Sequence, residues 1–300
     1  MYKKNRREEI IGYIKKRQNL YYITKGIYKF IFLNPLIGRM LWLKAKHNHT
    51  SSIFSYEPCL CGNSSYTTYL NYGKNKVIEC TKCKLWRNFP KPESGVYEKE
   101  MAVGYDNNPE VSTQLKEIFT QFKKYLPIEI NILDFGCGDG RAIVLAKELG
   151  FKNIYGLEIS NHLLKRARGV GAIVFDDINE IPKDLRFDII IADNVFEHVP
   201  NLNGELLNIK KIMSDNGTLI AFVPNIRSKK MHTGYLDLLW NTHYWQFNPE
   251  TFSGLLKRND FNVLDCKTLT ENSDRILKIS NPEVTGKENG CVFVVARAKK

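Results

Sequence analysis

The sequence predicts an α/β protein with an open, mainly parallel sheet and helices on both faces. The first observation is an apolar segment at 130–135, followed by a loop with glycines at every second position and a helical pattern at 141–149. The second is a continued alternation of strand and helix patterns, at 153–158, 161–168, 171–175, 187–192, 202–213 and 218–223. The third is the nearly continuous apolar run at 187–192, which is typical of a strand buried on both faces.

Length, charge and cysteine content narrow the class further. The chain has 300 residues, enough for one full core with appendages. Its net charge of +12 is uneven, because residues 1–50 hold 12 Lys/Arg against two Glu, and the rest holds 32 basic and 30 acidic residues. Seven cysteines without an apolar leader before them predict a cytoplasmic, reducing setting. No run of 18 apolar residues occurs, so a membrane span is not expected.

Residues 1–50 are expected to form a basic amphipathic helical arm. Its apolar side could pack on the protein itself or on a second subunit. A basic helix of this kind could also make a peripheral contact with an anionic membrane, here at the inner face. Contact with nucleic acid is the weaker third alternative. Composition does not separate these, and the oligomeric state is not predicted.

Four cysteines predict a small zinc-ribbon-like module at 51–92. Cys59 and Cys61 form one pair, Cys80 and Cys83 the other, and short strands are expected between them at 66–70 and 76–79. Four thiolates from two turns suit a structural zinc ion, which would stabilise a module too small to fold unaided. The first pair is one residue tighter than the usual knuckle, and redox or incidental cysteines are the alternative. A connector is expected at 93–109, before a main domain at 110–300.

The glycine loop indicates which ligand the sheet binds. A dinucleotide fingerprint needs its third glycine one residue later, where Arg141 stands. Asp134, Gly136, Gly138 and Gly140 instead resemble the first motif of class I S-adenosylmethionine (SAM) dependent methyltransferases. The resemblance implies a Rossmann-like seven-stranded sheet, with the helix at 249–259 and strands at 261–267 and 291–297 completing it. The last strand would be antiparallel.

The acids at the next strand ends fit the same resemblance. Glu158 follows Asp134 by 24 residues and is expected to accept hydrogen bonds from the ribose hydroxyls. By resemblance, Asp177 and the amide of Ile178 would meet the adenine, with Asp176 as the alternative in a shifted register. The expected cofactor residues are therefore Asp134, Gly136, Cys137, Gly138, Gly140, Glu158, Ile159, Asp177, Ile178 and Asn194.

A second match concerns the acceptor. The strand at 187–192 followed by Glu197, His198 and Val199 resembles ubiquinone-type O-methyltransferases and their sugar-modifying relatives, in which similar cysteine modules precede the main domain. This implies methyl transfer to a hydroxyl, most plainly of a sugar in a glycan or glycolipid. His198 and His243 are the candidate general bases, since histidine titrates near the working pH. An aromatic insertion at 229–247 is expected to roof the acceptor pocket.

Two alternatives stay open. Glu197, His198 and His243 are similar to the metal-binding set of small-RNA 2′-O-methyltransferases, which would make the protein a metal-assisted RNA or small-molecule methyltransferase, with Mg as one candidate ion. That family has a further Glu where this chain has Asn194. The alternative of another class is a non-catalytic SAM-binding scaffold. The intact glycines and Glu158 argue against a lost cofactor site.

Overall fold

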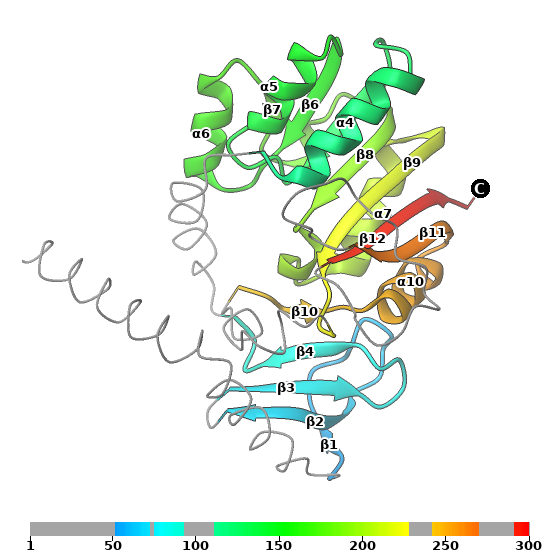
Figure 1. Cartoon of the computed structure of the whole chain (residues 1–300). Coiled ribbons are helices and arrows are strands. Elements are labelled where there is room, and N and C mark those ends of the chain that lie inside the picture. Colours follow the sequence, from blue (N-terminus) through cyan, green and yellow to red (C-terminus); the bar gives the residue numbers. More distant parts are fainter. Residues whose placement is uncertain (1–51, 73–74, 93–110, 228–241, 270–290, 300) are drawn as a thin grey trace, which may run out of the picture.

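The computed structural model describes residues 52–72, 75–92, 111–227, 242–269 and 291–299. These residues form two sheets that lie one beyond the other, a larger one of seven strands and a smaller one of five (Figure 1). The expected arm at 1–50, the connector at 93–109 and most of the insertion at 229–247 and of the loop at 268–289 lie outside the described residues. Among the described residues, no helix is long and apolar enough to cross a membrane.

The larger sheet has the expected architecture. Its strands run in the order β11-β12-β9-β8-β5-β6-β7, and the antiparallel β12 separates β9 from β11. The bounds are β5 Asn131–Phe135, β6 Asn153–Leu157, β7 Ile173–Phe175, β8 Phe187–Asp193, β9 Met213–Pro224, β11 Phe261–Leu269 and β12 Cys291–Ala298. The predicted α/β fold, with an antiparallel last strand, is confirmed. It is the seven-stranded sheet that the resemblance to SAM-dependent methyltransferases implies.

Helices cover both faces of this sheet. They are α4 Thr113–Tyr125, α5 Arg141–Glu148, α6 Asn161–Gly169, α7 Leu202–Ile212 and α10 Pro249–Arg258, with short 3-10 turns η1 Ile178–Glu180 and η2 Phe196–His198. Successive strand residues point to opposite faces, so Ile132 packs in the cluster with α4, α5 and α6, whereas Leu133 packs with α7 and α10. Each face therefore has its own hydrophobic core.

Side chains at the helix starts define where several helices begin. The Ser112 hydroxyl accepts from the amide of Leu115 at the start of α4, and the Asn201 side chain accepts from the amide of Gly204 at the start of α7. Asn248 and Thr251 form a reciprocal capping box at the start of α10. These caps satisfy amides that have no partner within the helix.

The smaller sheet, of order β1-β2-β3-β4-β10, carries the four paired cysteines. Its strands are β1 Phe54–Ser55, β2 Ser65–Tyr72, β3 Asn75–Cys80, β4 Trp86–Phe89 and β10 Trp245–Gln246, all antiparallel. We refer to its described part from 52 to 92 as the cysteine module. Three strands were not predicted: β1, β4, and β10, which comes from the segment after the main sheet's fifth strand. The module also shares a hydrophobic cluster with α7 and α10, through Tyr66, Ile78 and Leu85.

Candidate functional site

The glycine loop joins β5 to α5 with an uncommon backbone conformation. Gly136, Gly138 and Gly140 all have positive φ, of 79°, 58° and 81°. Gly140 is the N-cap of α5, so the loop leads straight into the positive end of that helix. A Cβ on Gly136 would lie 2.5 Å from a methyl carbon of Val195. The residue must therefore be glycine for two reasons, its φ and its close contact.

Glu158, directly after β6, ties this loop to the next strand. One carboxylate oxygen accepts from the amide of Gly138 at 2.9 Å and the other from the amide of Ser160 at 2.8 Å. The side chain is buried, and burial raises its pKa, an effect opposed by the bonds from Ser160 and Gly138. Each oxygen keeps lone pairs beyond these amide bonds, and Glu158 lines the cavity described next.

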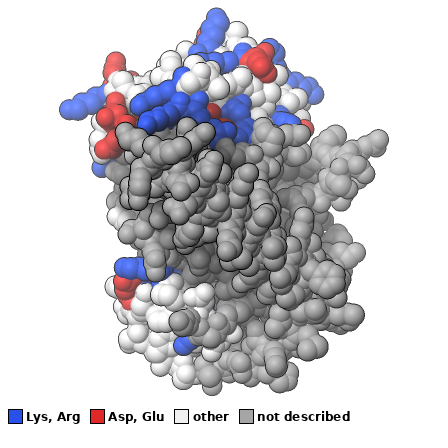
Figure 2. All heavy atoms as spheres, turned by 90° about the vertical axis from the view of Figure 1, so that its left-hand side faces the viewer, with Lys and Arg blue, Asp and Glu red and all other residues white. Residues whose placement is uncertain are grey.

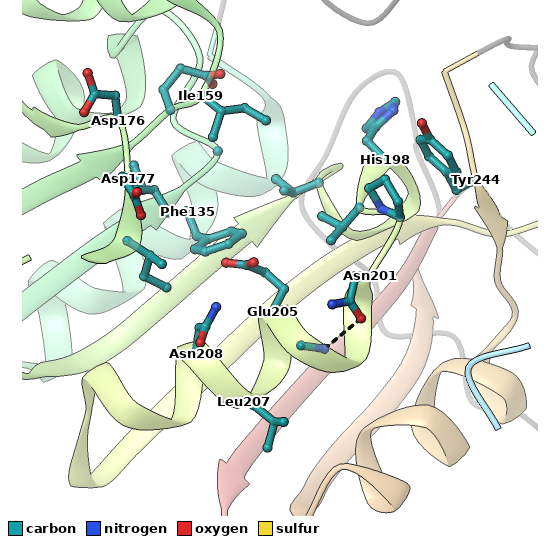
Figure 3. Close-up of a pocket in the computed structure, with 18 of the residues that line it drawn as sticks. Phe135, Ile159, Asp176, Asp177, His198, Asn201, Glu205, Leu207, Asn208 and Tyr244 are labelled. Atoms are coloured by element: carbon teal, nitrogen blue, oxygen red, sulfur yellow. Dashed lines mark hydrogen bonds between the residues drawn. The ribbon is translucent and has the colours of Figure 1, made fainter. Parts of the chain in front are cut away.

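A cavity of about 860 Å³ runs along the carboxyl edge of the sheet. Figure 3 shows Ile159, Asp176 and Asp177 at one end, and His198 and Tyr244 at the other. We define the glycine-loop end by Gly136, Glu158, Ile159, Asp177 and Ile178. We define the histidine end by Pro92, His198, Val199, Thr242 and Tyr244.

Helix α7 forms a polar wall between the two ends. Asn201, Glu205 and Asn208 line the cavity at helical spacing, and Figure 3 shows Glu205 and Asn208 projecting into it. Burial raises the pKa of Glu205, and the charge of Asp177 adds to this. This wall was not predicted, although the 201, 205, 208 spacing of polar residues is visible in the sequence. Such spacing is also found on any solvated helix face.

Two further carboxyl groups lie beside the loop, those of the buried Asp134 and the half-buried Asp193. Burial raises the pKa of Asp134 to about 7, with smaller contributions from Asp193 and Glu158. Burial also raises the pKa of Asp193 to about 6, although the Ser112 hydroxyl donates to it at 2.8 Å. Asp193 ends β8 and was not among the predicted site residues. The predicted Asn194 has a φ of 55° and donates to Asp193 at 3.0 Å.

Three side chains converge at the histidine end. Glu197, His198 and His243 each offer a ligand atom, and these atoms all lie within 4.8 Å of one another. The two imidazole rings are edge-on, with centroids 4.6 Å apart, and Nε2 of His198 lies 3.9 Å from a Glu197 oxygen. Glu197 and His243 are 1% and 2% exposed, so only His198 of the three lines the cavity.

Burial makes this cluster electrically neutral near pH 7. It raises the pKa of Glu197 to about 8, and it lowers that of His198 to about 4 despite the contact of His198 with the Thr242 carbonyl. Burial and the neighbouring His198 also lower the pKa of His243. Because Nδ1 of His198 lies 3.1 Å from that carbonyl oxygen, Nδ1 must carry the proton. The Nε2 atom of His198 is then an unprotonated acceptor.

The four cysteines of the module also converge. Their Sγ atoms all lie within 4.8 Å of one another, with Cys59 and Cys83 at 3.5 Å and Cys61 and Cys80 at 3.6 Å. Tetrahedral zinc with Zn–S bonds of about 2.3 Å needs S···S separations of about 3.8 Å. Hydrogen bonds lower the pKa of Cys83 to about 5, and the hydrogen bond with Cys59 makes the largest contribution to this shift. The spacing therefore fits a metal ion.

The tight first pair is accommodated by its turn. Gly62 has a φ of 80° and donates its amide to the carbonyl of Cys59 at 2.7 Å. Lys84 takes the left-handed conformation after the second pair, at a φ of 62°. The Asn63 side chain donates to Sγ of Cys80 at 3.3 Å, as a group that supports a metal-bound thiolate does.

The predicted cofactor residues divide into two sets. Those that line the cavity are Gly136, Glu158, Ile159, Asp177 and Ile178. Of the others, Asp134, Cys137, Gly138 and Gly140 lie in or behind the loop, and the exposed Asn194 directly follows β8. Cys137 is buried, and its thiol packs against Gly156, at the place where a Cβ on Gly156 would lie. Cys137 therefore contributes only its backbone to the loop.

Comparison with known proteins agrees with this geometry. The family described as "Methyltransferase domain" matches residues 108–265, over half of the chain. The chain belongs to this family.

Individual relatives match over parts of the chain. The ribosomal protein L11 methyltransferase of Paraburkholderia phytofirmans is 26% identical over 42% of this chain and 42% of its own length. The ubiquinone biosynthesis O-methyltransferase of Rickettsia akari is 26% identical over 52% of this chain and 67% of its own length. The chain thus spans under half the length of the first of these relatives.

Solved structures share the fold. A plantazolicin methyltransferase in complex with SAH and a triazolic desmethylPZN analogue has a TM-score of 0.50 and 16% identity, over 69% of this chain and 93% of its own. A chain from the complex between the Haloferax volcanii Trm112 methyltransferase activator and a methyltransferase has a TM-score of 0.50 and 15% identity, over 68% and 98%.

Proposed function

We propose that the protein is a SAM-dependent methyltransferase that methylates a hydroxyl group, most plainly on a sugar of a glycan or glycolipid. The observation that carries this is the buried Glu158 carboxylate, which is bonded by two backbone amides and still faces the cavity. When bound, SAM would supply an activated methyl group on a sulfonium. Glu158 would hold its ribose hydroxyls, and Asp177 and Ile178 its adenine.

The chain's own part in transfer is to orient the acceptor and remove its proton. His198 lines the cavity, and with Nδ1 donating to the Thr242 carbonyl its Nε2 is unprotonated, so Nε2 would be the atom that accepts the proton of an acceptor hydroxyl. His198 would take up the hydroxyl proton as the acceptor oxygen gains the methyl group that bound SAM would supply. His243 and Glu197 would hold the His198 ring in place from behind.

Two features support a polyhydroxylated acceptor. The cavity of about 860 Å³ extends well past the glycine-loop end. Its α7 wall carries Asn201, Glu205 and Asn208, whose amides and carboxyl can donate to and accept from neighbouring hydroxyls. A sugar is the acceptor class that such a wall suits.

The cysteine module is proposed to hold structural zinc on Cys59, Cys61, Cys80 and Cys83. Four protein ligands complete a tetrahedral site, so the ion would stabilise the module and take no part in chemistry. Mass spectrometry under native conditions should find one zinc ion per chain. No zinc in freshly purified protein that nonetheless shows an ordered module would overturn this assignment.

A second candidate is a metal-assisted methyltransferase acting on RNA or another small acceptor. The convergence of Glu197, His198 and His243 favours it, because two imidazoles and one carboxylate are a common set for a catalytic ion with open positions. An ion there would polarise the acceptor hydroxyl. The carboxamide of Asn194 is a poor further ligand and is already bonded to Asp193.

We propose a cytoplasmic location for the protein, with the basic arm in peripheral contact with anionic membrane. Figure 2 shows Lys and Arg gathered with acidic residues on the upper part of the described face, over α5 and α6. Part of this basic surface is paired, since Arg166 lies 3.3 Å from Asp139 and Arg168 3.7 Å from Asp176. Most of the net positive charge that could favour an anionic partner lies in the sequence of the arm, residues 1–50.

The direct test is methyl labelling. Purified protein and SAM with a labelled methyl group are added to separated glycolipid and RNA fractions of the source cell. Label in the glycolipid, absent with Glu158→Ala, is the expected result. Label in the RNA would overturn the glycan acceptor and favour the metal-assisted reaction, and SAM binding without label in any fraction would favour a non-catalytic scaffold.

A further inference from the structure

The cysteine module and the histidine end meet at one short segment, residues 242–247. On one side its strand β10 pairs with β4 of the module, with Trp245 opposite Arg87 and Gln246 opposite Trp86. On the other side it contacts the η2 turn, which carries Glu197 and His198. The segment therefore connects the smaller sheet to the turn that carries Glu197 and His198.

Hydrogen bonds of both backbone and side chains join residues 242–247 to the η2 turn and to Val199, the residue after it. The amide of Tyr244 donates to the carbonyl of Glu197 at 2.8 Å, and the indole N–H of Trp245 donates to the carbonyl of Val199 at 2.9 Å. The Thr242 carbonyl accepts from Nδ1 of His198 at 3.1 Å and so sets its tautomer. His243 lies within the same segment. The position of the segment 242–247 thus fixes both His198 and His243.

Arg87 holds the segment on the module side. Its side chain is buried, and its guanidinium lies 4.9 Å from the centroids of both the Tyr56 and the Trp245 rings. Glu57 pairs with it at 3.2 Å. A planar guanidinium can stack between two rings and bind a carboxylate at once, whereas an ammonium cannot.

The partners of Arg87 are fixed by the cysteine cluster. Glu57 comes two residues before Cys59, and its carbonyl accepts from the Tyr66 hydroxyl at 2.9 Å. Arg87 itself follows Cys83 by four residues, in β4. Leu60, between Cys59 and Cys61, accepts from the Asn203 side chain of α7 at 2.8 Å. The cysteine turns thus also contact the helix that walls the cavity.

We propose that Arg87 is a positioning residue that links the folded, metal-loaded cysteine module to the histidine end of the cavity. It holds Trp245, and with it residues 242–247, so that Glu197, His198 and His243 keep their mutual geometry. The module then acts as a structural wall of the acceptor site, and loss of its metal disables methyl transfer while cofactor binding persists. Of the measurements that test this proposal, only labelled methyl transfer rests on the proposed methyltransferase function.

The test compares Arg87→Lys with wild type. Hydrogen–deuterium exchange of the peptide covering 242–248 should become at least tenfold faster, because the amide of Tyr244 loses its fixed acceptor. The Kd for S-adenosylhomocysteine should stay within twofold, and labelled methyl transfer should fall at least tenfold. Treating the wild type with a zinc chelator should give the same three results.

Two further variants keep the test decisive. Arg297→Lys, on the far strand β12 where Arg297 contacts Thr218, is the matched control and should change none of these readouts. Trp245→Phe keeps an aromatic ring but removes the indole N–H that bonds to Val199, so it should speed exchange of 242–248 even if Arg87→Lys does not fold.

Unchanged exchange in both Arg87→Lys and Trp245→Phe would overturn the proposal. Exchange needs neither cofactor nor acceptor, so this failure is distinct from failure of the proposed function, which would appear as wild-type protein that binds no S-adenosylhomocysteine.

Discussion

The two ends of the cavity are built in opposite ways. At the glycine-loop end, an acidic side chain is held by backbone amides, and Gly138 and Glu158 lie only 20 residues apart. At the histidine end, side chains that burial keeps neutral are held by segments far apart in the chain, the η2 turn and residues 242–247. The arrangement at the glycine-loop end suits a cofactor that is the same in every reaction. The arrangement at the histidine end suits an acceptor site, whose residues can differ between proteins with different acceptors.

The difference implies that a substitution can impair one end of the cavity and leave the other end intact. The largest expected effect concerns the histidine end. His198→Asn keeps a hydrogen-bonding side chain but removes the base, so kcat for methyl transfer should fall by about 10²–10⁴-fold. Measured by labelled methyl transfer, the loss should leave cofactor affinity intact.

The matched control for this variant is His162→Asn, on the exposed side of α6. It should transfer methyl groups at the wild-type rate. A His198→Asn protein as active as wild type would remove His198 from catalysis.

A smaller effect is expected at the glycine-loop end. Glu158→Gln loses the charge that would bind two ribose hydroxyls, and each charged hydrogen bond contributes about 1.5–3 kcal/mol. Affinity for S-adenosylhomocysteine should therefore fall on the order of 10²-fold, by calorimetry. Glu148→Gln, at the exposed end of α5, is the control and should bind as wild type does.

Gly136→Ala should have a moderate effect. A methyl group there combines a φ of 79° with a contact of 2.5 Å to Val195, a strain of about 1–3 kcal/mol. We expect a lower melting temperature and cofactor affinity reduced about tenfold. Gly171→Ala has a similar φ of 77° but nothing within 4 Å, so it should destabilise without weakening cofactor binding. Equal cofactor affinity in both variants would contradict the close contact.

The smallest effect is on the pH dependence of stability. The pKa of Glu197 rises to about 8 on folding, so the folded state holds a proton there that the unfolded state releases above its ordinary pKa. That contribution to stability is complete below the unfolded pKa and is lost as the pH rises through 8. The free energy of unfolding of the cofactor-free protein should decline from pH 6.5 to 8.

In Glu197→Gln this decline should be shallower, as denaturant titrations at a series of pH values would show. Some decline should remain from Asp134, whose pKa rises to about 7. An identical slope in the variant and the wild type would show that Glu197 is ionised in the folded protein.

The sequence was sufficient for features that depend on neighbours in the chain. The strand–loop–helix unit around Gly136 and Glu158, the alternation of strands and helices, and the pairing of four cysteines all follow from local patterns. Even the tight Cys59–Cys61 pair carried its explanation in Gly62, which supplies the turn.

Features that depend on distant segments were not predictable in this way. The strand β10 has two residues, and nothing in Trp245 and Gln246 indicates that their partner is a strand more than 150 residues earlier. Nothing in the local sequence marks Arg87, yet it is 4% exposed and lies between two rings. Asp193 became notable only because Ser112 and Asp134 lie beside it. Long-range packing decided each case.

The central claim is that cofactor binding and acceptor chemistry belong to different ends of one cavity. Calorimetric titration of S-adenosylhomocysteine into wild type, Glu158→Gln and His198→Asn tests it most directly. The account predicts equal affinity for wild type and His198→Asn, and a loss on the order of 10²-fold for Glu158→Gln. Full affinity in Glu158→Gln, or an equal loss in His198→Asn, would contradict it.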